Sequence, residues 1–334
     1  MKKIASYALG CKVNQYESEA IAELFAEKGY EVVSVDDEAD VYIINTCTVT
    51  NFGDKKSRQL IRKVKRQNEN AIVAVVGCYA QTAPEELAAV HGVNLVIGTK
   101  DKSKIVELVE DYQAEQGVQN YVTDIMHERV FEPLEIKKLA NRTRAYLKIQ
   151  DGCSQFCSYC IIPYARGPIR SRQPEDVIAE VKRLAENGFK EVVLTGIHVA
   201  SYGKDLKTIT LTDIIRQVHE VEGIERIRFS SIEPNVVTEE FAAAMAELPK
   251  VCDHFHLSLQ SGCDKTLKEM NRKYDTEKYR QAAALLRKYL PDVAITTDII
   301  VGFPGETEEE FQDTLELVKK VGYMQLFTFI YSKR

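Results

Sequence analysis

Short apolar runs alternate with amphipathic stretches through the first third of the chain. The runs are typical of buried strands and lie at 4–10, 40–46, 71–77 and 93–98. The intervening stretches have helical periodicity, and helices are expected at 17–29, 55–66 and 102–112. Because strands and helices alternate, the pattern predicts a parallel, flavodoxin-like α/β sheet. In such sheets ligands bind beyond the carboxyl ends of the strands.

A second series of strand and helix patterns begins at residue 145. Six strands are expected, at 145–150, 190–196, 226–232, 254–262, 294–305 and 324–331. With a helical pattern between successive strands, this series predicts a partial TIM-type (β/α)6 barrel, with functional groups at the carboxyl ends of its strands. The stretch before it breaks the alternation. The expected domains are therefore 1–125 and 145–334, joined by a linker over 126–144.

Composition limits the class of protein. The chain has 334 residues, enough for two or three domains, and no apolar run of about 18 residues, so no contact with a membrane is expected. The first apolar run is too short for a secretory signal, which predicts a cytoplasmic protein with reduced cysteines. The net charge of −6 argues mildly against a protein whose whole surface binds nucleic acid.

One predicted helix is strongly basic in spite of the acidic chain. Its basic residues are Lys55, Lys56, Arg58, Arg62, Lys63, Lys65 and Arg66. Two interpretations stay open: a solvated helix face, or a surface that binds a phosphate backbone with salt-dependent affinity.

Three of the eight cysteines follow the first three strands. Cys11, Cys47 and Cys78 each come directly after one of these apolar runs. A single cysteine there is usually a small apolar residue. Three at equivalent positions of a parallel sheet would converge on one edge, so we expect a metal site with three cysteine ligands.

Three more cysteines lie close together in C-S-Q-F-C-S-Y-C, at Cys153, Cys157 and Cys160. A zinc site would need a fourth Cys or His nearby, but the next histidine is His198 and no second C-x-x-C pair follows. Three thiolates suit a [4Fe–4S] cluster with one iron open to a substrate or cofactor. The remaining Cys252 and Cys263 are interpreted as ordinary small residues.

This motif resembles the C-x3-C-x-aromatic-C signature of the radical S-adenosylmethionine (SAM) superfamily. Y-A-L-G-C-K-V-N-Q-Y-E-S-E, I-I-N-T-C-T-V-T and V-V-G-C-Y-A-Q extend the resemblance to the radical SAM methylthiotransferases, over essentially all 334 residues. It implies that SAM binds the open iron and is cleaved to a 5′-deoxyadenosyl radical. It also implies a second [4Fe–4S] cluster on Cys11, Cys47 and Cys78, which carries or hosts the inserted sulfur, and a second SAM as methyl donor.

The same resemblance suggests which residues contact SAM. Tyr159 would lie beside the adenine, as would the segment D-I-I-V-G-F-P-G, although its glycines could simply end a strand. Other candidates lie at the ends of predicted strands. The full set is Tyr159, Thr195, Gly196, Ser230, Ser231, Glu233, Gln260 and Gly302.

Subfamilies differ in substrate: N6-isopentenyladenosine-37 of tRNA, N6-threonylcarbamoyladenosine-37 of tRNA, or an aspartate of a ribosomal protein. L-G-C-K-V-N-Q-Y-E-S-E, N-T-C-T-V-T-N and Q-S-G-C-D-K-T-L-K-E-M-N-R-K-Y are most similar to the threonylcarbamoyladenosine subfamily. Arg166, Arg170 and Arg172 are predicted to pair with the threonyl carboxylate of that substrate. The expected partners are tRNA and a flavodoxin-like or ferredoxin-like electron donor.

The resemblance also raises an expectation about the end of the chain. Family members usually continue into a small tRNA-binding β domain, TRAM, and this domain is expected to be absent here because the sequence stops at F-T-F-I-Y-S-K-R. Two alternatives stay open: another radical SAM enzyme with an auxiliary cluster that acts on protein, and a non-enzymatic iron–sulfur or zinc module that binds RNA.

Overall fold

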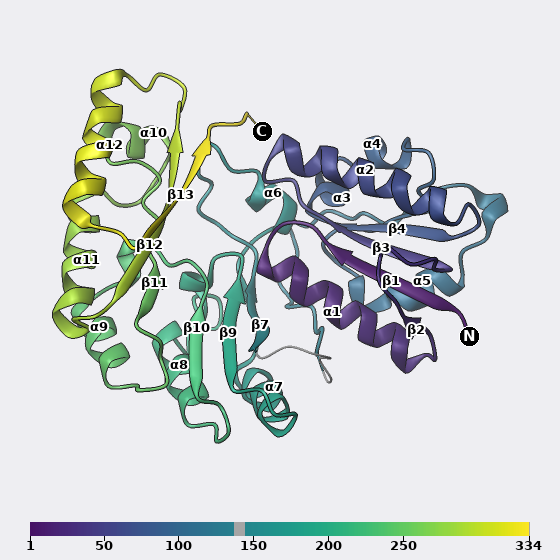
Figure 1. The fold of residues 1–334 in the computed structure, drawn as a ribbon, viewed down its shortest axis with the longest axis horizontal. Helices are drawn as coiled ribbons and strands as arrows, with labels where there is room; N and C mark the ends of the chain where they lie inside the picture. Colours follow the sequence, from purple (N-terminus) through teal and green to yellow (C-terminus); the bar gives the residue numbers. More distant parts are fainter. Residues whose placement is uncertain (137–143, 334) are drawn as a thin grey trace. The chain divides into compact units, whose positions relative to one another are not determined.

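The computed structural model describes residues 1–136 and 144–333 (Figure 1). It divides into two compact units, Met1–Arg142 with Ile161–Arg170, and Thr143–Cys160 with Ser171–Arg334. The ten residues after the last cysteine of the C-x3-C-x2-C motif therefore pack with the first unit. The expected boundaries at 125/126 and 144/145 stay a prediction, and part of the expected linker, 137–143, lies outside the described residues.

The first unit contains a six-stranded parallel sheet in the order β2-β1-β3-β4-β5-β6. Its long strands are β1 (Lys3–Ala8), β3 (Val41–Thr46) and β4 (Ile72–Gly77). Its short strands are β2 (Glu31–Val32), β5 (Leu95–Val96) and β6 (Gln119–Asn120). Every residue of β3 is buried, as expected for a strand covered on both faces.

Helices cover both faces of this sheet. Their bounds are α1 (Lys12–Glu27), α2 (Asn51–Gln67), α3 (Cys78–Thr82), α4 (Pro84–Ala88) and α5 (Ile105–Glu110). One core cluster joins α2, α3 and α4 to the sheet, and a second joins α1 and α5 to it. The helix α6 (Ile162–Arg166) also belongs to this unit and packs against α3.

The second unit is a half-barrel in which β7 pairs with β9, β9 with β10, β11 with β12 and β12 with β13, all in parallel. One sheet has the order β10-β9-β7-β8 and another has the order β11-β12-β13, and the bridge between Ile232 and Leu257 continues the series from one to the other. The strands are β7 (Arg144–Asp151), β8 (Arg170–Ser171), β9 (Glu191–Gly196), β10 (Arg226–Phe229), β11 (His254–His256), β12 (Ala294–Val301) and β13 (Gln325–Ile330). The prediction of a flavodoxin-like sheet followed by a partial (β/α)6 barrel is confirmed.

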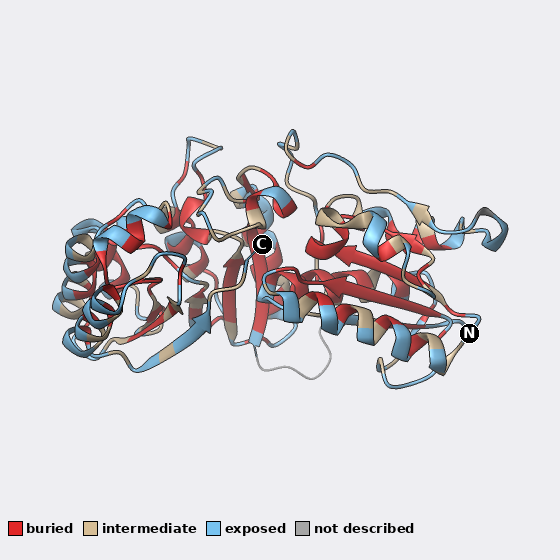
Figure 2. Ribbon diagram, turned by 90° about the horizontal axis from the view of Figure 1, so that it is seen from above, coloured by how far each residue is buried: buried red, intermediate tan, exposed pale blue. Residues whose placement is uncertain are grey.

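The helices of the second unit lie outside its strands (Figure 1). They are α7 (Pro174–Glu186), α8 (Leu211–His219), α9 (Glu239–Ala246), α10 (Asp264–Glu269), α11 (Thr276–Tyr289) and α12 (Glu308–Val321). Buried residues follow most of the strands, whereas β13 and the outer helix faces are largely exposed (Figure 2). Among the described residues, no helix is long and apolar enough to cross a membrane.

Candidate functional site

The first cysteine trio, Cys11, Cys47 and Cys78, lies at one edge of the first unit's sheet. Cys11 directly precedes α1, Cys47 directly follows β3, and Cys78 begins α3 after β4. Because β1, β3 and β4 are adjacent and parallel, these three positions share the carboxyl edge of the sheet. Cys47 and Cys78 are buried, while Cys11 is exposed.

Asn14 connects the loops that carry the trio. Its buried amide donates to the carbonyl of Leu9 at 2.7 Å and to that of Thr46 at 2.9 Å, and its oxygen lies 3.8 Å from the Cys11 sulfur. Asn45 in turn donates to the Asn14 carbonyl at 3.1 Å. These bonds tie the loops before Cys11 and Cys47 to each other.

Arg166 is a charged residue that contacts this trio. Its side chain is fully buried, and its Nε lies 3.1 Å from the Sγ of Cys78. Its Nη1 donates to Glu17 Oε1 at 2.6 Å and its Nη2 to Asn14 Oδ1 at 2.6 Å. Lys102, also fully buried, lies 3.4 Å from Glu17. A buried ion network therefore borders one cysteine of the trio.

The three thiols of this trio are electrostatic neighbours. Burial, together with the Cys78 and Cys11 thiols, raises the pKa of Cys47 to about 12 against the lowering effects of the Val49 backbone and Arg166. Such a thiol is protonated near neutral pH. A metal that binds it must displace the proton, so metal binding here should tighten as pH rises.

Gly10 has no side chain, and the Cys47 side chain occupies the space where one would lie. Gly10 has φ +95°, and a Cβ at this position would lie 2.6 Å from both the Cβ and the Sγ of Cys47. We expect Gly10→Ala to cost about 1–2 kcal/mol for the left-handed backbone and about 1–3 kcal/mol for the overlap, and to lower iron binding by displacing Cys47. Thermal unfolding and iron content after reconstitution would measure both effects.

A matched control for this change is Gly29→Ala. Gly29 has φ +86° but nothing within 4 Å of its added Cβ. It should lose only the backbone part of the stability and keep its iron, and an equal loss of iron in both variants would contradict the steric explanation.

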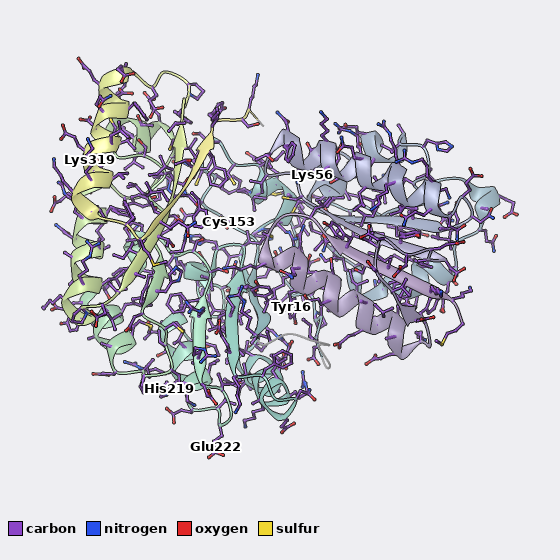
Figure 3. The ribbon with its side chains drawn as sticks, viewed as in Figure 1. Tyr16, Lys56, Cys153, His219, Glu222 and Lys319 are labelled. Carbon is purple, nitrogen blue, oxygen red and sulfur yellow. The ribbon has the colours of Figure 1, made fainter. Side chains whose placement is uncertain are left out.

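The second trio, Cys153, Cys157 and Cys160, follows β7 in the second unit. Figure 3 shows Cys153 at the carboxyl ends of the half-barrel strands, whereas His219 and Glu222 lie at the opposite end of this unit. All three cysteines are partly exposed. Burial, together with the neighbouring Cys160, Cys157 and Glu233, raises the pKa of Cys153 to about 12 against the lowering effect of the Gln155 backbone N–H.

The loop of this trio is held by the segment between α10 and α11. Ser158 donates through its backbone to the Met270 carbonyl at 3.1 Å, and Asn271 donates to the Phe156 carbonyl at 2.8 Å. Phe156 and Asn271 both have left-handed backbones, with φ 51° and 58°. Nη1 of Arg272 lies 3.2 Å from the Sγ of Cys157.

Glu233 joins the groups around the second trio. It pairs with Arg272 at 2.9 Å and with His198 at 3.2 Å, and it accepts from Gln155 at 3.1 Å. Burial acts to raise its pKa, but the His198 bond and the charges of His198, Arg272 and Lys204 outweigh this effect and lower it below the usual range. Glu233 is therefore a buried carboxylate that stays ionised beside the cysteine loop.

The residues predicted to contact SAM all lie at or just beyond the carboxyl ends of barrel strands, apart from Tyr159 within the cysteine loop. These residues differ in burial, in hydrogen bonding and in the space around them. Thr195 is buried and donates to the Leu147 carbonyl at 3.1 Å, and Gly196 leaves room for the Gln150 side chain. Ser231 is exposed, and Gly302 has φ +70° with open space around it.

Tyr159, Ser230 and Gln260 are also among the residues predicted to contact SAM. Burial raises the pKa of Tyr159, as do Cys157, Tyr274 and Cys160, whereas Arg272 lowers it. Ser230 donates through its backbone to Leu194 at 2.9 Å, and Gln260 has a left-handed φ of 74°. The assignment of the whole set to SAM stays a prediction.

The three arginines predicted to bind substrate are all buried. Arg166 pairs with Glu17, Arg172 pairs with Glu180, and Arg170 donates to the Pro168 carbonyl at 3.1 Å. Each guanidinium therefore has protein partners in this structure. The assignment of these arginines to the substrate carboxylate stays a prediction.

Sequence reasoning missed Arg272, Gln155 and Asn271 and left the role of His198 open. Arg272 lies in a polar loop 115 residues beyond the cysteine whose sulfur it approaches. No spacing or periodicity connects the two. The one local signal is Asn271, since asparagine is among the few residues that adopt the left-handed backbone readily.

Neither trio has the geometry of a single-ion site. Within the ranges 1–136 and 144–333, no three His, Cys, Asp or Glu side chains converge closely enough to hold one metal ion. A four-iron cluster sets a different condition, because each thiolate binds its own iron and the sulfurs stay apart. The donor chemistry of both trios fits such a cluster better than zinc.

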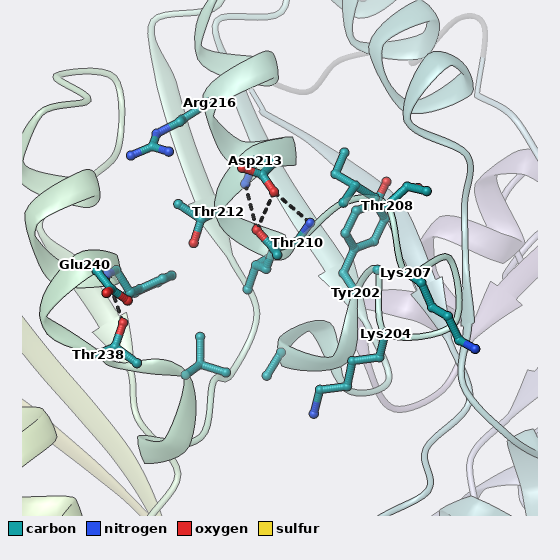
Figure 4. Close-up of a pocket in the computed structure, with 16 residues that line it drawn as sticks. Tyr202, Lys204, Lys207, Thr208, Thr210, Thr212, Asp213, Arg216, Thr238 and Glu240 are labelled. Atoms are coloured by element: carbon teal, nitrogen blue, oxygen red, sulfur yellow. Dashed lines mark hydrogen bonds between the residues drawn. The ribbon is translucent and has the colours of Figure 1, made fainter.

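A separate cavity of about 670 Å³ lies between the loop after β9 and the first turns of α8 and α9 (Figure 4). Lys204, Lys207 and Arg216 contribute positive charge to its lining. Asp213, also in the lining, is already engaged as the capping partner of Thr210. None of the six cysteines of the two trios lines this cavity.

Comparisons with known proteins identify two family regions. Residues 147–318 match the model of the radical SAM superfamily, and residues 3–98 match the uncharacterized protein family UPF0004. The chain is 48% identical to the threonylcarbamoyladenosine tRNA methylthiotransferase MtaB of Bacillus subtilis, over 100% of this chain and 74% of that protein.

The chain belongs to the radical SAM methylthiotransferase family. It is also 42% identical to the tRNA-2-methylthio-N(6)-dimethylallyladenosine synthase of Thermoanaerobacter sp. X514, over 97% of this chain and 70% of that protein. As a radical SAM enzyme it uses SAM and [4Fe–4S] chemistry, as the resemblance predicted.

A solved structure supports the fold. The radical SAM methyltransferase TsrM from Kitasatospora setae, solved with tryptophan and a SAM analogue, matches with a TM-score of 0.71 over 98% of this chain and 73% of that chain. At 14% identity this likeness extends to the fold alone.

Proposed function

We propose that this chain transfers a methylthio group to C2 of N6-threonylcarbamoyladenosine at position 37 of tRNA, with SAM as both methyl donor and radical source. The product would be 2-methylthio-N6-threonylcarbamoyladenosine. The observation that carries this proposal is the pair of cysteine trios, each at a carboxyl edge of a parallel sheet, in a methylthiotransferase chain. The choice of nucleoside follows the higher identity to the threonylcarbamoyladenosine enzyme, 48% against 42%.

The two trios would hold the two clusters. Cys153, Cys157 and Cys160 would bind the SAM-cleaving [4Fe–4S] cluster, and Cys11, Cys47 and Cys78 the auxiliary one. When bound, the clusters and SAM supply the electron, the radical and the methylthio sulfur, which no side chain can supply.

The chain's own residues have a positioning task around these groups. Gln155, His198 and Arg272 all bond to Glu233, so one buried carboxylate fixes three side chains beside the cysteine loop. Such preorganisation keeps the reacting groups in place without rearrangement during the reaction. The same proposal includes the predicted SAM contacts, a cytoplasmic location, and tRNA and a flavodoxin-like or ferredoxin-like protein as partners.

The substrate is tested with defined tRNA. Anaerobically reconstituted protein would be supplied with SAM, a reductant and tRNA that carries either threonylcarbamoyl-adenosine or isopentenyl-adenosine at position 37. Mass spectrometry of the digested nucleosides should find the methylthio group on the threonylcarbamoyl nucleoside. A product on the isopentenyl nucleoside alone would move the chain to the alternative substrate, and a product on neither would point to a ribosomal-protein aspartate.

The basic helix α2 is a candidate surface for the phosphate backbone of tRNA. Arg58 pairs with Glu86 and Lys63 with Asp36, and Lys65 donates to the Ala71 carbonyl at 2.8 Å. Four further basic side chains are exposed: Lys56, which lies over the Phe52 ring, and the three others Lys55, Arg62 and Arg66. Figure 3 shows Lys56 on the same helix.

Removal of these three charges is expected to weaken tRNA binding and flatten its salt dependence. Each lost phosphate contact should reduce the slope of log K against log salt by about 0.7–0.9. The triple change Lys55→Ala, Arg62→Ala and Arg66→Ala would be compared by filter binding at several salt concentrations with Lys288→Ala, Lys319→Ala and Lys320→Ala on α11 and α12. Equal slopes in the two variants would support the solvated-face interpretation instead.

A further inference from the structure

Arg166 is fixed between a predicted cluster ligand and a buried carboxylate of the same unit. Its Nε–H points to the Cys78 sulfur at 3.1 Å, and its Nη atoms bond to both oxygens of Glu17 at 2.6 and 3.1 Å. The guanidinium is fully buried, as is the Glu17 side chain. A buried charge in such a place needs its partners, and here one partner is a sulfur.

We propose that Arg166 is a positioning residue of the auxiliary cluster and that its bond to Cys78 raises the tendency of that cluster to accept an electron. This inference rests on the proposed function, since it requires a cluster on Cys11, Cys47 and Cys78. Reduction adds one negative charge to the cluster and its thiolates. An N–H donor and a positive charge beside a thiolate stabilise the reduced form, and hydrogen bonds to sulfur are among the factors that set cluster potentials.

Glu17 has the opposite effect on the same equilibrium. Its carboxylate is buried beside Arg166 and Lys102, and its negative charge opposes the arrival of an electron. Removal of Arg166 and removal of Glu17 should therefore shift the reduction equilibrium in opposite directions. A purely structural role for the ion pair predicts no such opposition, because loss of either partner would simply destabilise the unit.

Arg166 comes from the segment that follows the second cysteine trio in the chain. Arg166 lies six residues after Cys160, in the segment 161–170 that packs with the first unit. The segment that directly follows the second trio therefore contains a residue that contacts Cys78, a predicted ligand of the auxiliary cluster.

The experiment uses protein with Cys153, Cys157 and Cys160 replaced by alanine, so that only the auxiliary cluster forms. After anaerobic reconstitution, dithionite would supply one electron per cluster in a redox titration followed by electron paramagnetic resonance. Arg166→Met should lower the equilibrium constant for reduction about tenfold, or about 59 mV, and Glu17→Gln should raise it. Arg172→Gln, which breaks the buried pair with Glu180 in the second unit, should leave it unchanged.

A double variant, Arg166→Met with Glu17→Gln, removes both charges and avoids a stranded carboxylate. It should keep its iron and show an equilibrium constant between those of the parent and Arg166→Met. Full iron with an equilibrium constant equal in all variants would overturn the inference, as would loss of iron from the double variant while Glu17→Gln keeps its iron. A parent protein that binds no iron would instead overturn the proposed auxiliary cluster itself.

Discussion

Replacement of Cys153, Cys157 and Cys160 by alanine is expected to lower the iron content of reconstituted protein from about eight to about four atoms per chain, the content of one [4Fe–4S] cluster. It should also abolish reductive cleavage of SAM. The reason is that these thiolates are the only anchors proposed for the cluster that binds SAM, and their loop follows β7 at the carboxyl ends of the barrel strands. Iron analysis and chromatography of 5′-deoxyadenosine measure the two outcomes.

A control for this variant comes from another cysteine of the same unit. Cys252 precedes β11, so it lies toward the amino ends of the strands, whereas Cys153 follows the carboxyl end of β7. Cys252→Ala should keep about eight irons and full SAM cleavage, as expected if two intact clusters are present. Loss of iron from this control, or no loss from the triple variant, would contradict the assignment of the cluster to the C-x3-C-x2-C loop.

The edge positions of both trios could be predicted from the sequence because parallel sheets impose them. Cys47 and Cys78 follow continuous apolar runs that were recognisable as β3 and β4, and adjacent parallel strands end at the same edge. The prediction needed only the order of strands and helices. Short elements escaped it: β6 pairs through only two residues, too few to show any periodicity.

The groups that surround the cysteines could not be predicted, because tertiary contacts bring them there. Arg166 is 88 residues from Cys78 and 149 from Glu17 along the chain. Its nearness in sequence to the second trio does not reveal that it packs with the first unit. Sequence proximity does not say with which unit a segment packs.

Strand ends were a second limit. The strand expected at 254–262 ends at His256, and the chain then takes an irregular path in which Gln260 has φ 74°. A positive φ at a residue other than glycine is a local cost that surrounding contacts must offset. Strained residues of this kind cluster at functional sites. When such a residue is not a glycine, its type does not reveal from the sequence that its φ is positive.

Replacement of Cys11, Cys47 and Cys78 by alanine should separate the two halves of the chemistry. Iron is expected to fall from about eight to about four atoms per chain, as for loss of one [4Fe–4S] cluster. SAM should still be cleaved to 5′-deoxyadenosine, because the loop of Cys153, Cys157 and Cys160 and its Glu233 network belong to the other unit. The methylthio nucleoside should disappear, since the sulfur is proposed to be held by the first trio.

A single change, Cys47→Ala, tests the same site more gently. Cys47 is buried against Gly10, so alanine removes only the sulfur and leaves the turn intact. Full iron content in this variant would count against a three-cysteine auxiliary site. Loss of four irons with loss of SAM cleavage as well would mean that the two trios are not independent, and the division of roles between them would have to be withdrawn. Retained cleavage without methylthio product would place sulfur transfer, and not radical formation, at the edge of the first sheet.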